Sequence, residues 1–336
     1  GAMSKIVCFG EALIDMLAQP PATPDAPRAF LQYAGGAPAN VAVAVARLGG
    51  DAHFAGMLGR DMFGDFLHES FRAAGVAVDC IVRTDQAKTA LAFVALDAAG
   101  ERSFSFYRPP AADLLFRAEH FRPGCFAGTG SFHVCSNSLT EEAVAAATFD
   151  GMRRAREAGA VVSVDLNLRP ALWPAGEDPS PRLWQALAHA DLVKLSQEEL
   201  DYLARPLGGG AEGAARVRER VFEGCAQLLV VTDGAAPVRW QTRQAGGEVA
   251  GFRVEARDTT AAGDAFVGGL LFRMGEVGGS GRGFAAFCRD EHAIVEAIRF
   301  GAAAGAFAVT RKGAFAAMPS LDDVHHLLQE QTEHVA

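Results

Sequence analysis

Short apolar runs alternate with amphipathic stretches along most of the chain. A short apolar run bounded by glycine, proline or polar residues is typical of a buried strand, and apolar residues spaced three and four apart are typical of a helix. Strands are predicted at 5–9, 53–58, 132–134, 161–166, 191–195 and 227–232. Helices are predicted at 39–48, 62–74, 138–158, 261–274, 294–309 and 321–329, and a further helix from 197. This alternation favours an α/β fold with a doubly wound, mostly parallel sheet flanked by helices.

Two helix starts carry local signals. Ser138 and Glu141 have the spacing of a capping box, which predicts the start of the helix that ends near 158. In the helix at 261–274, apolar side chains recur every four residues and form the stripe of a core-facing helix. Alternating apolar and charged residues at 252–257 predict a half-buried strand just before it. This segment is therefore predicted to be a strand, a tight turn and a helix.

Two segments break the alternation. Residues 13–33 are proline-rich and loosely patterned, and residues 89–107 hold two strand-like runs around a turn at 97–100. A hairpin inside an α/β chain is often a flap beside the ligand site, so we predict a small β-sheet lid; the alternative is an edge hairpin with no role in binding. The predicted division gives 1–15, 34–88 and 113–336 to the α/β core, and 16–33 and 89–112 to the lid.

The composition of the 336-residue chain is that of a soluble globular protein, with 50% hydrophobic and 21% charged residues. Its net charge of −9 and lack of a long basic run argue against a nucleic-acid partner. No uninterrupted apolar run is long enough to cross a bilayer and no signal peptide opens the chain, so we expect a cytoplasmic protein without a membrane partner. The six cysteines show no CxxC or metal spacing, and we expect buried thiols rather than a disulfide framework.

The start of the helix at 261–274 is the first candidate site. Asp264 stands in its first turn, after Gly263, which would let a ligand approach the backbone closely. The free N–H groups of a helix start attract anions. An anion cradle beside a carboxylate base is what phosphoryl transfer to an alcohol requires. The alternative is that Asp264 is only a helix-start carboxylate stabilised by the helix dipole.

A second candidate site precedes the helix at 39–48. Gly35 and Gly36 give a hinge or a close approach to ligand, and Asn40 follows in the first turn, where it could hold a sugar hydroxyl. The alternative is a simple turn. Asp15 interrupts an apolar run at 12–17, so it is either at an exposed strand end or an acceptor of hydroxyl hydrogen bonds.

Polar side chains also follow the strand at 161–166. Asp165, Asn167 and Arg169 stand at its carboxyl end, where open α/β sheets bind their ligands. Arg108 follows the aromatic run of the predicted lid. Taken singly, each could be a solvated polar side chain. The sequence has no GxxxxGK[ST] loop, no GxSxG and no GxGxxG after the first strand, so a nucleotide would have to bind by another route.

The order of these segments resembles the ribokinase and fructokinase family of carbohydrate kinases, the pfkB type, over about residues 7–319. The signature segments are 35–40 and 258–264. The subgroup that the chain resembles most is fructokinase, on the residues at 10–15, 35–40, 106–108 and 167–173.

The resemblance implies a ribokinase-like fold and an ATP-dependent sugar kinase that transfers the γ-phosphoryl of MgATP to a primary hydroxyl, with fructose the expected sugar. It implies that Asp264 is the general base, with the N–H groups of Ala262, Gly263 and Asp264 as the anion hole. It further implies a homodimer formed through the lid, with Arg108 closing over the sugar.

Other roles follow from the same resemblance. The sugar-binding set would be Asp15, Gly35, Gly36, Asn40, Phe106, Arg108 and Arg169. Lys194, Ser196 and Glu199 would handle the ATP phosphates and Mg²⁺ through water, with Thr232, Gly234 and Ala302 on the nucleotide side. K⁺ would be held by Asp258 with carbonyls of Thr260, Ala308, Arg311 and Gly313, a hard-oxygen set that suits such an ion.

Departures from the family pattern keep other readings open. Ala261 stands where fructokinases usually have glycine, and Pro237 removes an N–H donor from the turn near the nucleotide. A 2-keto-3-deoxygluconate kinase or a ribokinase is the alternative, although Ala37 replaces the lysine that would favour ribokinase. A sugar-binding regulator without chemistry is a third reading. A dehydrogenase is poorly supported, because the dinucleotide fingerprint is absent.

Overall fold

The computed structural model of the chain describes residues 3–97, 99 and 101–335, and it confirms the α/β class. The strands of the main sheet are β1 (Lys5–Phe9), β4 (Asp51–Gly59), β5 (Ile81–Thr84), β8 (Thr129–Cys135), β9 (Val161–Asp165), β10 (Leu192–Ser196), β11 (Leu228–Thr232), β12 (Val238–Gln241) and β13 (Gly246–Val249). Their order is β13-β12-β11-β10-β9-β8-β1-β4-β5. Neighbours pair in parallel except at the β11–β12–β13 edge, which is antiparallel.

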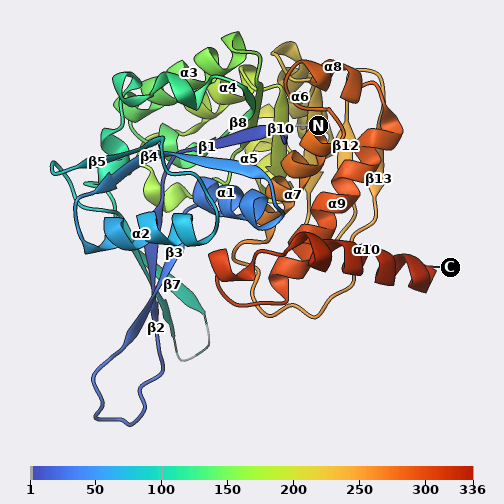
Figure 1. Cartoon of the computed structure of the whole chain (residues 1–336). Helices are drawn as coiled ribbons and strands as arrows, with labels where there is room; N and C mark the ends of the chain where they lie inside the picture. Colours follow the sequence, from blue (N-terminus) through green and yellow to red (C-terminus); the bar gives the residue numbers. More distant parts are fainter. Residues whose placement is uncertain (1–2, 98, 100, 336) are drawn as a thin grey trace.

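Helices cover both faces of this sheet (Figure 1). One face packs on α1 (Ala37–Arg47), α2 (Met62–Ala73), α7 (Ala262–Glu276), α8 (Phe284–Phe287) and α9 (Glu291–Val309), and the other on α3 (Glu142–Glu157), α4 (Ser180–Ala188), α5 (Gln197–Ala204) and α6 (Gly210–Glu223). The last helix, α10 (Leu321–Val335), packs on α9. Within β1, Ile6 and Cys8 enter one core cluster while Val7 and Phe9 enter the other. A strand covered on both faces reads as a continuous apolar run, which is the pattern that predicted it.

A separate sheet projects from this body (Figure 1). Its strands are β2 (Leu13–Ala18), β3 (Phe30–Gly35), β6 (Leu91–Leu96) and β7 (Arg102–Tyr107), in the order β3-β2-β6-β7. We call these four strands the lid sheet. The predicted hairpin is the antiparallel β6–β7 pair; positions 98 and 100 of its predicted turn lie outside the described residues. The loosely patterned segment at 13–33 contributes two strands that sequence reasoning did not predict, and β3 continues to Gly35.

Two local predictions are wrong. Residues 252–257, all within the described part of the chain, form no strand; Phe252 packs beside α9 and α10, and the Arg257 N–H donates to the carbonyl of Val309 rather than to a neighbouring strand. The predicted capping box also fails, because the Ser138 hydroxyl donates to the Cys135 carbonyl within a 3-10 turn and α3 begins only at Glu142.

The cysteine prediction is also corrected. Cys80 and Cys125, 45 residues apart, form a disulfide, and Cys225 is exposed. Cys8, Cys135 and Cys288 are buried thiols as expected. A pair this far apart leaves no local spacing signal, because the fold alone brings the two residues together.

Among the residues that the structure describes, one helix, α9, with 19 residues, is long and apolar enough to cross a membrane by length and composition alone. It qualifies even though Glu296 and Arg299 interrupt its apolar run. More than half of it is buried inside the protein, where it packs between α7 and α10. This is the packing of a core helix.

Candidate active site

Asp264 lies where the two signature segments meet. It stands in the first turn of α7 and is 7% exposed. Its Oδ2 accepts a hydrogen bond of 2.9 Å from Nδ2 of Asn40, in the first turn of α1. Burial raises the pKa of Asp264 to about 7, the Asn40 hydrogen bond opposes this rise, and the nearby Asp165 charge adds to it. A carboxylate with a pKa near neutrality is suited to act as a base.

The start of α7 is also a place for an anion. The residue that precedes the helix at the N-cap position, Ala261, has no side chain that could cap it, and the first-turn N–H groups of a helix have no partner within the helix. A Cβ atom built on Gly263 would lie 3.3 Å from Nζ of Lys194, so an ammonium stands beside this helix start. One predicted donor is occupied, because the Ala262 N–H donates to the Thr259 carbonyl over 3.3 Å. The expected anion hole is thus centred on Gly263 and Asp264.

Two buried carboxylates surround that ammonium. Nζ of Lys194 lies 3.4 Å from Oδ2 of Asp165, on the adjacent strand β9. Burial raises the pKa values of Asp165 and Glu199, and these carboxylates in turn raise the pKa of Lys194 against the effect of its own burial. Oδ1 of Asp165 has no hydrogen-bond partner within the described residues. One ammonium cannot neutralise two carboxylates, and Oδ1 of Asp165 is free in the described part of the chain, so this side of the site could accept a bound cation. The described residues hold no group of three His, Cys, Asp or Glu that could bind a metal alone, so substrate phosphates would have to complete its ligands.

The first sugar-binding candidates gather on the lid side of Asp264. Asp15 lies on β2, and a Cβ atom on Gly35 would overlap its Oδ2, so the two residues are in contact. Burial raises the pKa of Asp15 to about 6, and Arg169 opposes the rise. Arg169 also acts on Asp264, where it lowers the pKa. The structure therefore brings Asp15, Gly35 and Arg169 together near the candidate base.

Gly36 is required by its own geometry. Its φ of +105° lies in the region that favours glycine, and a Cβ there would lie 2.6 Å from the carbonyl oxygen of Glu11. The turn therefore rests directly on the chain after β1, and it aims α1, with Asn40, at Asp264.

Arg108 lies elsewhere than expected. It is buried at the root of the lid sheet, where Nε donates to Oδ2 of Asp113 over 2.9 Å and Nη2 donates to the carbonyl of Asn137 over 2.5 Å. The guanidinium is thus turned into the protein and held there, whereas the resemblance implied that it closes over the sugar. Phe106 is half-buried on β7 and packs against the apolar cluster at the base of the lid sheet.

The nucleotide candidates lie at the carboxyl ends of β10 and β11. Ser196 and Thr232 are register partners there. Ser196 and Glu199 form a capping box for α5: the Glu199 N–H donates to the Ser196 hydroxyl over 3.1 Å, and Oε1 of Glu199 accepts from the Ser196 N–H over 2.9 Å. Gly234 turns the chain after β11 with a φ of +55°, and Ala302 is half-buried on α9. Ser196 and Glu199 thus have a structural role that sequence reasoning did not assign.

The segments of the expected K⁺ site lie side by side. Oδ1 of Asp258 accepts the Thr260 N–H over 2.9 Å, and Oδ2 accepts the Gly313 N–H over 3.3 Å. The Asp258 N–H donates to the carbonyl of Val309 over 3.0 Å. The Ala308 carbonyl accepts the Arg311 N–H over 3.3 Å. Although partial burial opposes it, hydrogen bonds from the Thr260 hydroxyl and from the N–H groups of Thr260 and Gly313 lower the pKa of Asp258, which keeps its charge.

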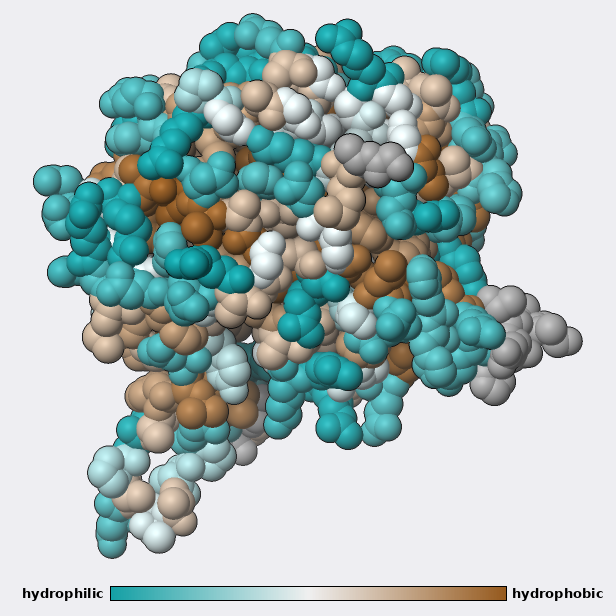
Figure 2. All heavy atoms as spheres, viewed as in Figure 1, coloured by the Kyte–Doolittle hydropathy of each residue, from teal (hydrophilic) through white to brown (hydrophobic). Residues whose placement is uncertain are grey.

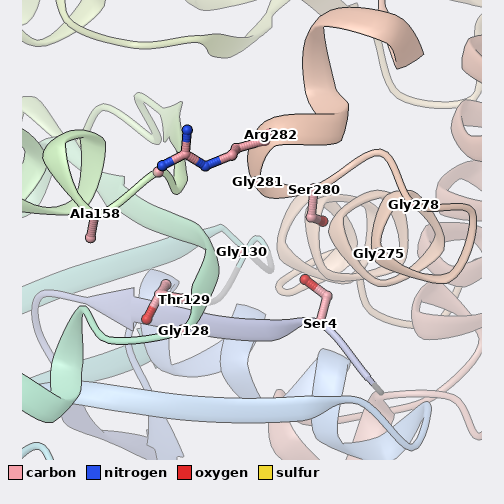
Figure 3. A pocket seen from close by; sticks show the side chains of 11 residues that line it. Ser4, Gly128, Thr129, Gly130, Ala158, Gly275, Gly278, Ser280, Gly281 and Arg282 are labelled. Atoms are coloured by element: carbon pink, nitrogen blue, oxygen red, sulfur yellow. The ribbon is translucent and has the colours of Figure 1, made fainter. Parts of the chain in front are cut away.

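A hollow of about 350 Å³ lies at the other end of the strands, where β1 and β8 begin (Figure 3). Ser4, which precedes β1, and Thr129, which opens β8, line it together with Ser280 and Arg282. It contains none of the predicted site residues. Ligands of open parallel sheets bind at the carboxyl ends of the strands, so we place the candidate site at Asp264.

Sequence reasoning missed a buried polar group next to the site. Glu11, Asp113 and Asn137 are each no more than 5% exposed. Glu11 directly precedes the apolar run at 12–17 that made Asp15 a candidate, so a local signal was present. Asp113 and Asn137 carry no comparable local signal.

Comparisons with known proteins identify the family of the chain. The model of the pfkB family carbohydrate kinases matches residues 3–321. Fructokinase-1 of Zea mays is 41% identical over 333 residues, which cover 97% of this chain and 98% of that protein. The crystal structure of fructokinase with bound ATP from Xylella fastidiosa has a TM-score of 0.94 at 61% identity, covering 98% of this chain and 100% of that one. A fructokinase double mutant from Vibrio cholerae O395, in a form with fructose, ADP and potassium ion bound, has a TM-score of 0.83 at 31% identity and covers 97% and 99%.

The family match and the geometry point the same way. The match spans nearly the whole chain, and the signature segments at 35–40 and 258–264 meet through Asn40 and Asp264. The chain belongs to the pfkB family of carbohydrate kinases.

Proposed function

We propose that this carbohydrate kinase is an ATP-dependent fructokinase, which transfers the γ-phosphoryl of MgATP to a primary hydroxyl of fructose. The observation that carries the proposal is the buried carboxylate of Asp264, held by Asn40 at an uncapped helix start with the Lys194 ammonium alongside. The fructokinases from Zea mays and Xylella fastidiosa, similar over nearly their whole length, support the choice of sugar.

Asp264 is the proposed general base. Its carboxylate accepts the proton of the sugar hydroxyl as the oxygen attacks the γ-phosphorus, and the bond from that phosphorus to the bridging oxygen of ATP breaks. A positioned base contributes roughly 10²–10⁴ to the rate. The N–H groups of Gly263 and Asp264 and the Lys194 ammonium stabilise the charge on the transferring group, and positioning and electrostatics supply the larger share in phosphoryl transfer.

The sugar is proposed to bind between the lid sheet and the start of α1. Asp15 accepts hydroxyl hydrogen bonds, and the glycine turn lets the ring approach the backbone closely. Oδ1 of Asn40 has no partner within the described residues and so is free to accept a hydroxyl hydrogen bond. Arg169 adds a donor on the same side. Arg108 belongs to this set only through its place at the root of the lid sheet, because its nitrogen donors are already bound to protein atoms.

Two cations are proposed. Mg²⁺ bound to the ATP phosphates would be held near Asp165 and Glu199 through water, where it would neutralise the charge that develops on the phosphates. K⁺ would be held beside Asp258 by the carbonyl of Thr260 and by carbonyls of the segment that faces it, those of Ala308, Arg311 and Gly313. The potassium ion in the fructokinase form from Vibrio cholerae O395 supports this second proposal.

We propose that two copies associate through the lid sheet. Leu31, Leu17, Val94 and Phe104 are register partners in turn across its four strands, so they form one apolar row on the face that carries Asp15. Leu31 and Phe104 are exposed in the single chain, and Figure 2 shows apolar residues on the projecting sheet. An exposed apolar face of this kind is typical of an interface.

A cytoplasmic location is also proposed, because both proposed substrates, ATP and a free sugar, are present in the cytoplasm. The Cys80–Cys125 disulfide is unusual for such a location. Counting free thiols in protein taken from the cytoplasm under alkylating conditions tests whether this pair is oxidised there.

The test of the function is ADP release across a panel of sugars, with and without K⁺. The proposal expects the highest kcat/KM with fructose and a lower rate without K⁺. A higher kcat/KM with 2-keto-3-deoxygluconate or ribose would replace fructokinase by one of those kinases. Tight sugar binding without ADP release would instead favour a regulator that has the fold without the chemistry.

A further inference from the structure

A buried polar network lies behind the glycine turn of the proposed sugar site. Its members, Glu11, Asn137, Arg108 and Asp113, are each no more than 5% exposed. Nδ2 of Asn137 donates to Oε1 of Glu11 over 2.8 Å, and the carbonyl of Asn137 accepts from Nη2 of Arg108. Nε of Arg108 donates to Oδ2 of Asp113 over 2.9 Å. The network therefore runs from the end of β1 to the root of the lid sheet.

Glu11 also contacts the glycine turn itself. The Ala37 N–H donates to Oε1 of Glu11 over 3.3 Å. A Cβ atom on Gly36 would lie 2.6 Å from the Glu11 carbonyl oxygen, and one on Gly10 would lie 2.9 Å from Cγ of Pro38. The two chain segments are therefore in direct contact, with no room for a side chain between them.

This turn leads to the proposed base. The Asn40 N–H donates to the Gly36 carbonyl over 2.9 Å, which closes the first turn of α1. The Asn40 side chain then donates to Asp264. A shift of the turn would therefore move the amide that holds the base. Glu11 itself is 1% exposed, and within the described residues its carboxylate makes no hydrogen bond with Asp264, so any effect on the base passes through α1.

We propose that Glu11 is a positioning residue for phosphoryl transfer, which fixes the turn that presents Asn40 to Asp264. The inference rests on the proposed function. The atom that does this is Oε1, which accepts from both Ala37 and Asn137. Oε2 has no partner within the described residues. The geometry of one acceptor oxygen, rather than the charge of the carboxylate, is therefore what holds the turn.

Two variants separate geometry from charge. Glu11→Gln keeps an oxygen at the position of Oε1 and removes the charge. Glu11→Asp keeps the charge and draws the carboxylate back by one methylene. Thr148→Val is the matched control, because the Thr148 hydroxyl is also fully buried but donates only to the Ser138 and Val144 carbonyls beside α3.

The readouts are fructose affinity by isothermal titration calorimetry and kcat as a function of pH, both on the full chain. Glu11→Gln should bind fructose close to the wild type. Glu11→Asp should bind it about ten-fold or more weakly, the size expected when a buried donor loses its acceptor. The KM for ATP should change little in either variant, and Thr148→Val should lower only the Tm.

The pH profile adds a readout that a merely structural role would not move. The groups that interact electrostatically with Asp264 are Asn40, Asp165, Lys194, Arg169, Cys8 and Cys135. Only Asn40 is attached to the turn. Because its hydrogen bond lowers the pKa of Asp264, a displaced Asn40 should move the acid limb of kcat in Glu11→Asp to higher pH.

Two results would overturn the proposal. The first is equal fructose affinity in Glu11→Gln and Glu11→Asp, with only the Tm lowered. The second is weaker fructose binding by Glu11→Gln than by the wild type, because the charge of the carboxylate would then be what matters. Should Glu11→Asp not fold, Ala37→Pro removes the donor of the same bond at a helix position that accepts proline, and unchanged fructose affinity there would equally refute it. Failure of the proposed function is distinguishable, since the wild type itself would then release little or no ADP with fructose.

Discussion

Nδ2 of Asn40 donates a hydrogen bond of 2.9 Å to Oδ2 of Asp264, which joins the first turns of α1 and α7 across 224 positions of sequence. The amide nitrogen of Asn40 donates to the carboxylate, and its Oδ1 has no partner within the described residues. One side chain can thus hold the proposed base and accept a hydrogen bond from a neighbouring sugar hydroxyl. Four of the five predictions below concern the groups around this pair.

The first prediction concerns pH. Burial raises the pKa of Asp264 from 3.8 to about 7, so the folded protein holds a proton that the unfolded chain has lost between these values. The contribution of Asp264 to the free energy of unfolding therefore falls as the pH rises through this window. Asp264→Asn, which cannot ionise, should be more stable than the wild type at about pH 8, and the difference should shrink towards about pH 4.

Thermal unfolding of both proteins across this range measures the difference. Asp165 and Glu199 also have pKa values raised by burial, but they are present in both proteins, so most of their own contribution cancels in the comparison. A Tm difference that does not vary with pH would contradict the raised pKa.

The second prediction concerns Lys194. Lys194→Met leaves Asp165 and Glu199 buried without their cation, a change that costs on the order of 3–5 kcal/mol when one partner of a buried pair is removed. We expect a lower free energy of unfolding and a raised KM for ATP, with fructose affinity little changed. Arg156→Met, which breaks a partly exposed pair with Asp191, is the control. An unchanged KM for ATP in Lys194→Met would show that Lys194 does not bind the ATP phosphates.

The third prediction separates strain from contact in the glycine turn. Gly36 and Gly49 both have positive φ, +105° and +93°, but only Gly36 would bring a Cβ against another part of the chain, within 2.6 Å of the Glu11 carbonyl. Each alanine variant should cost about 1–2 kcal/mol in backbone strain. Only Gly36→Ala should also raise the KM for fructose. Similar KM values for the two variants would show that the turn tolerates displacement.

The fourth prediction concerns the lid sheet. Phe104 is 54% exposed in the apolar row proposed as the dimer contact, and Met62, on the body, is 73% exposed. Phe104→Arg should shift the protein towards monomer in analytical ultracentrifugation, since a charge would be buried at the contact. Met62→Arg should leave association unchanged. A Phe104→Arg protein with wild-type sedimentation would place the contact elsewhere, or show that none forms.

Most of the strands and helices around the site could be predicted from the sequence, and the reasons are physical. A strand buried on both faces must be apolar throughout, so β1, β9, β10 and β11 were found close to their observed bounds. The start of α7 was also found, because glycine and small residues before an amphipathic helix leave a strong local signal. Alternation alone misled at 252–257, where the chain packs against α9 and α10 and not in a sheet.

Features that depend on distant partners could not be read from local patterns. The side chain of Arg108 is drawn inward by the carbonyl of Asn137, 29 positions away, and by Asp113, which is near in the sequence but forms no recognisable motif with it. The Cys80–Cys125 disulfide depends on the fold in the same way. Ser196 and Glu199 were assigned to phosphate binding by resemblance, although their three-residue spacing before an apolar helix is a capping-box signal that was available.

The most direct test of the account is the rate of fructose phosphorylation by Asp264→Asn in a single turnover, with fructose binding measured on the same sample. If Asp264 is the base, the rate should fall by roughly 10²–10⁴ or more while the dissociation constant for fructose stays close to that of the wild type. Phosphorylation near the wild-type rate by a variant that binds fructose normally would contradict the central claim.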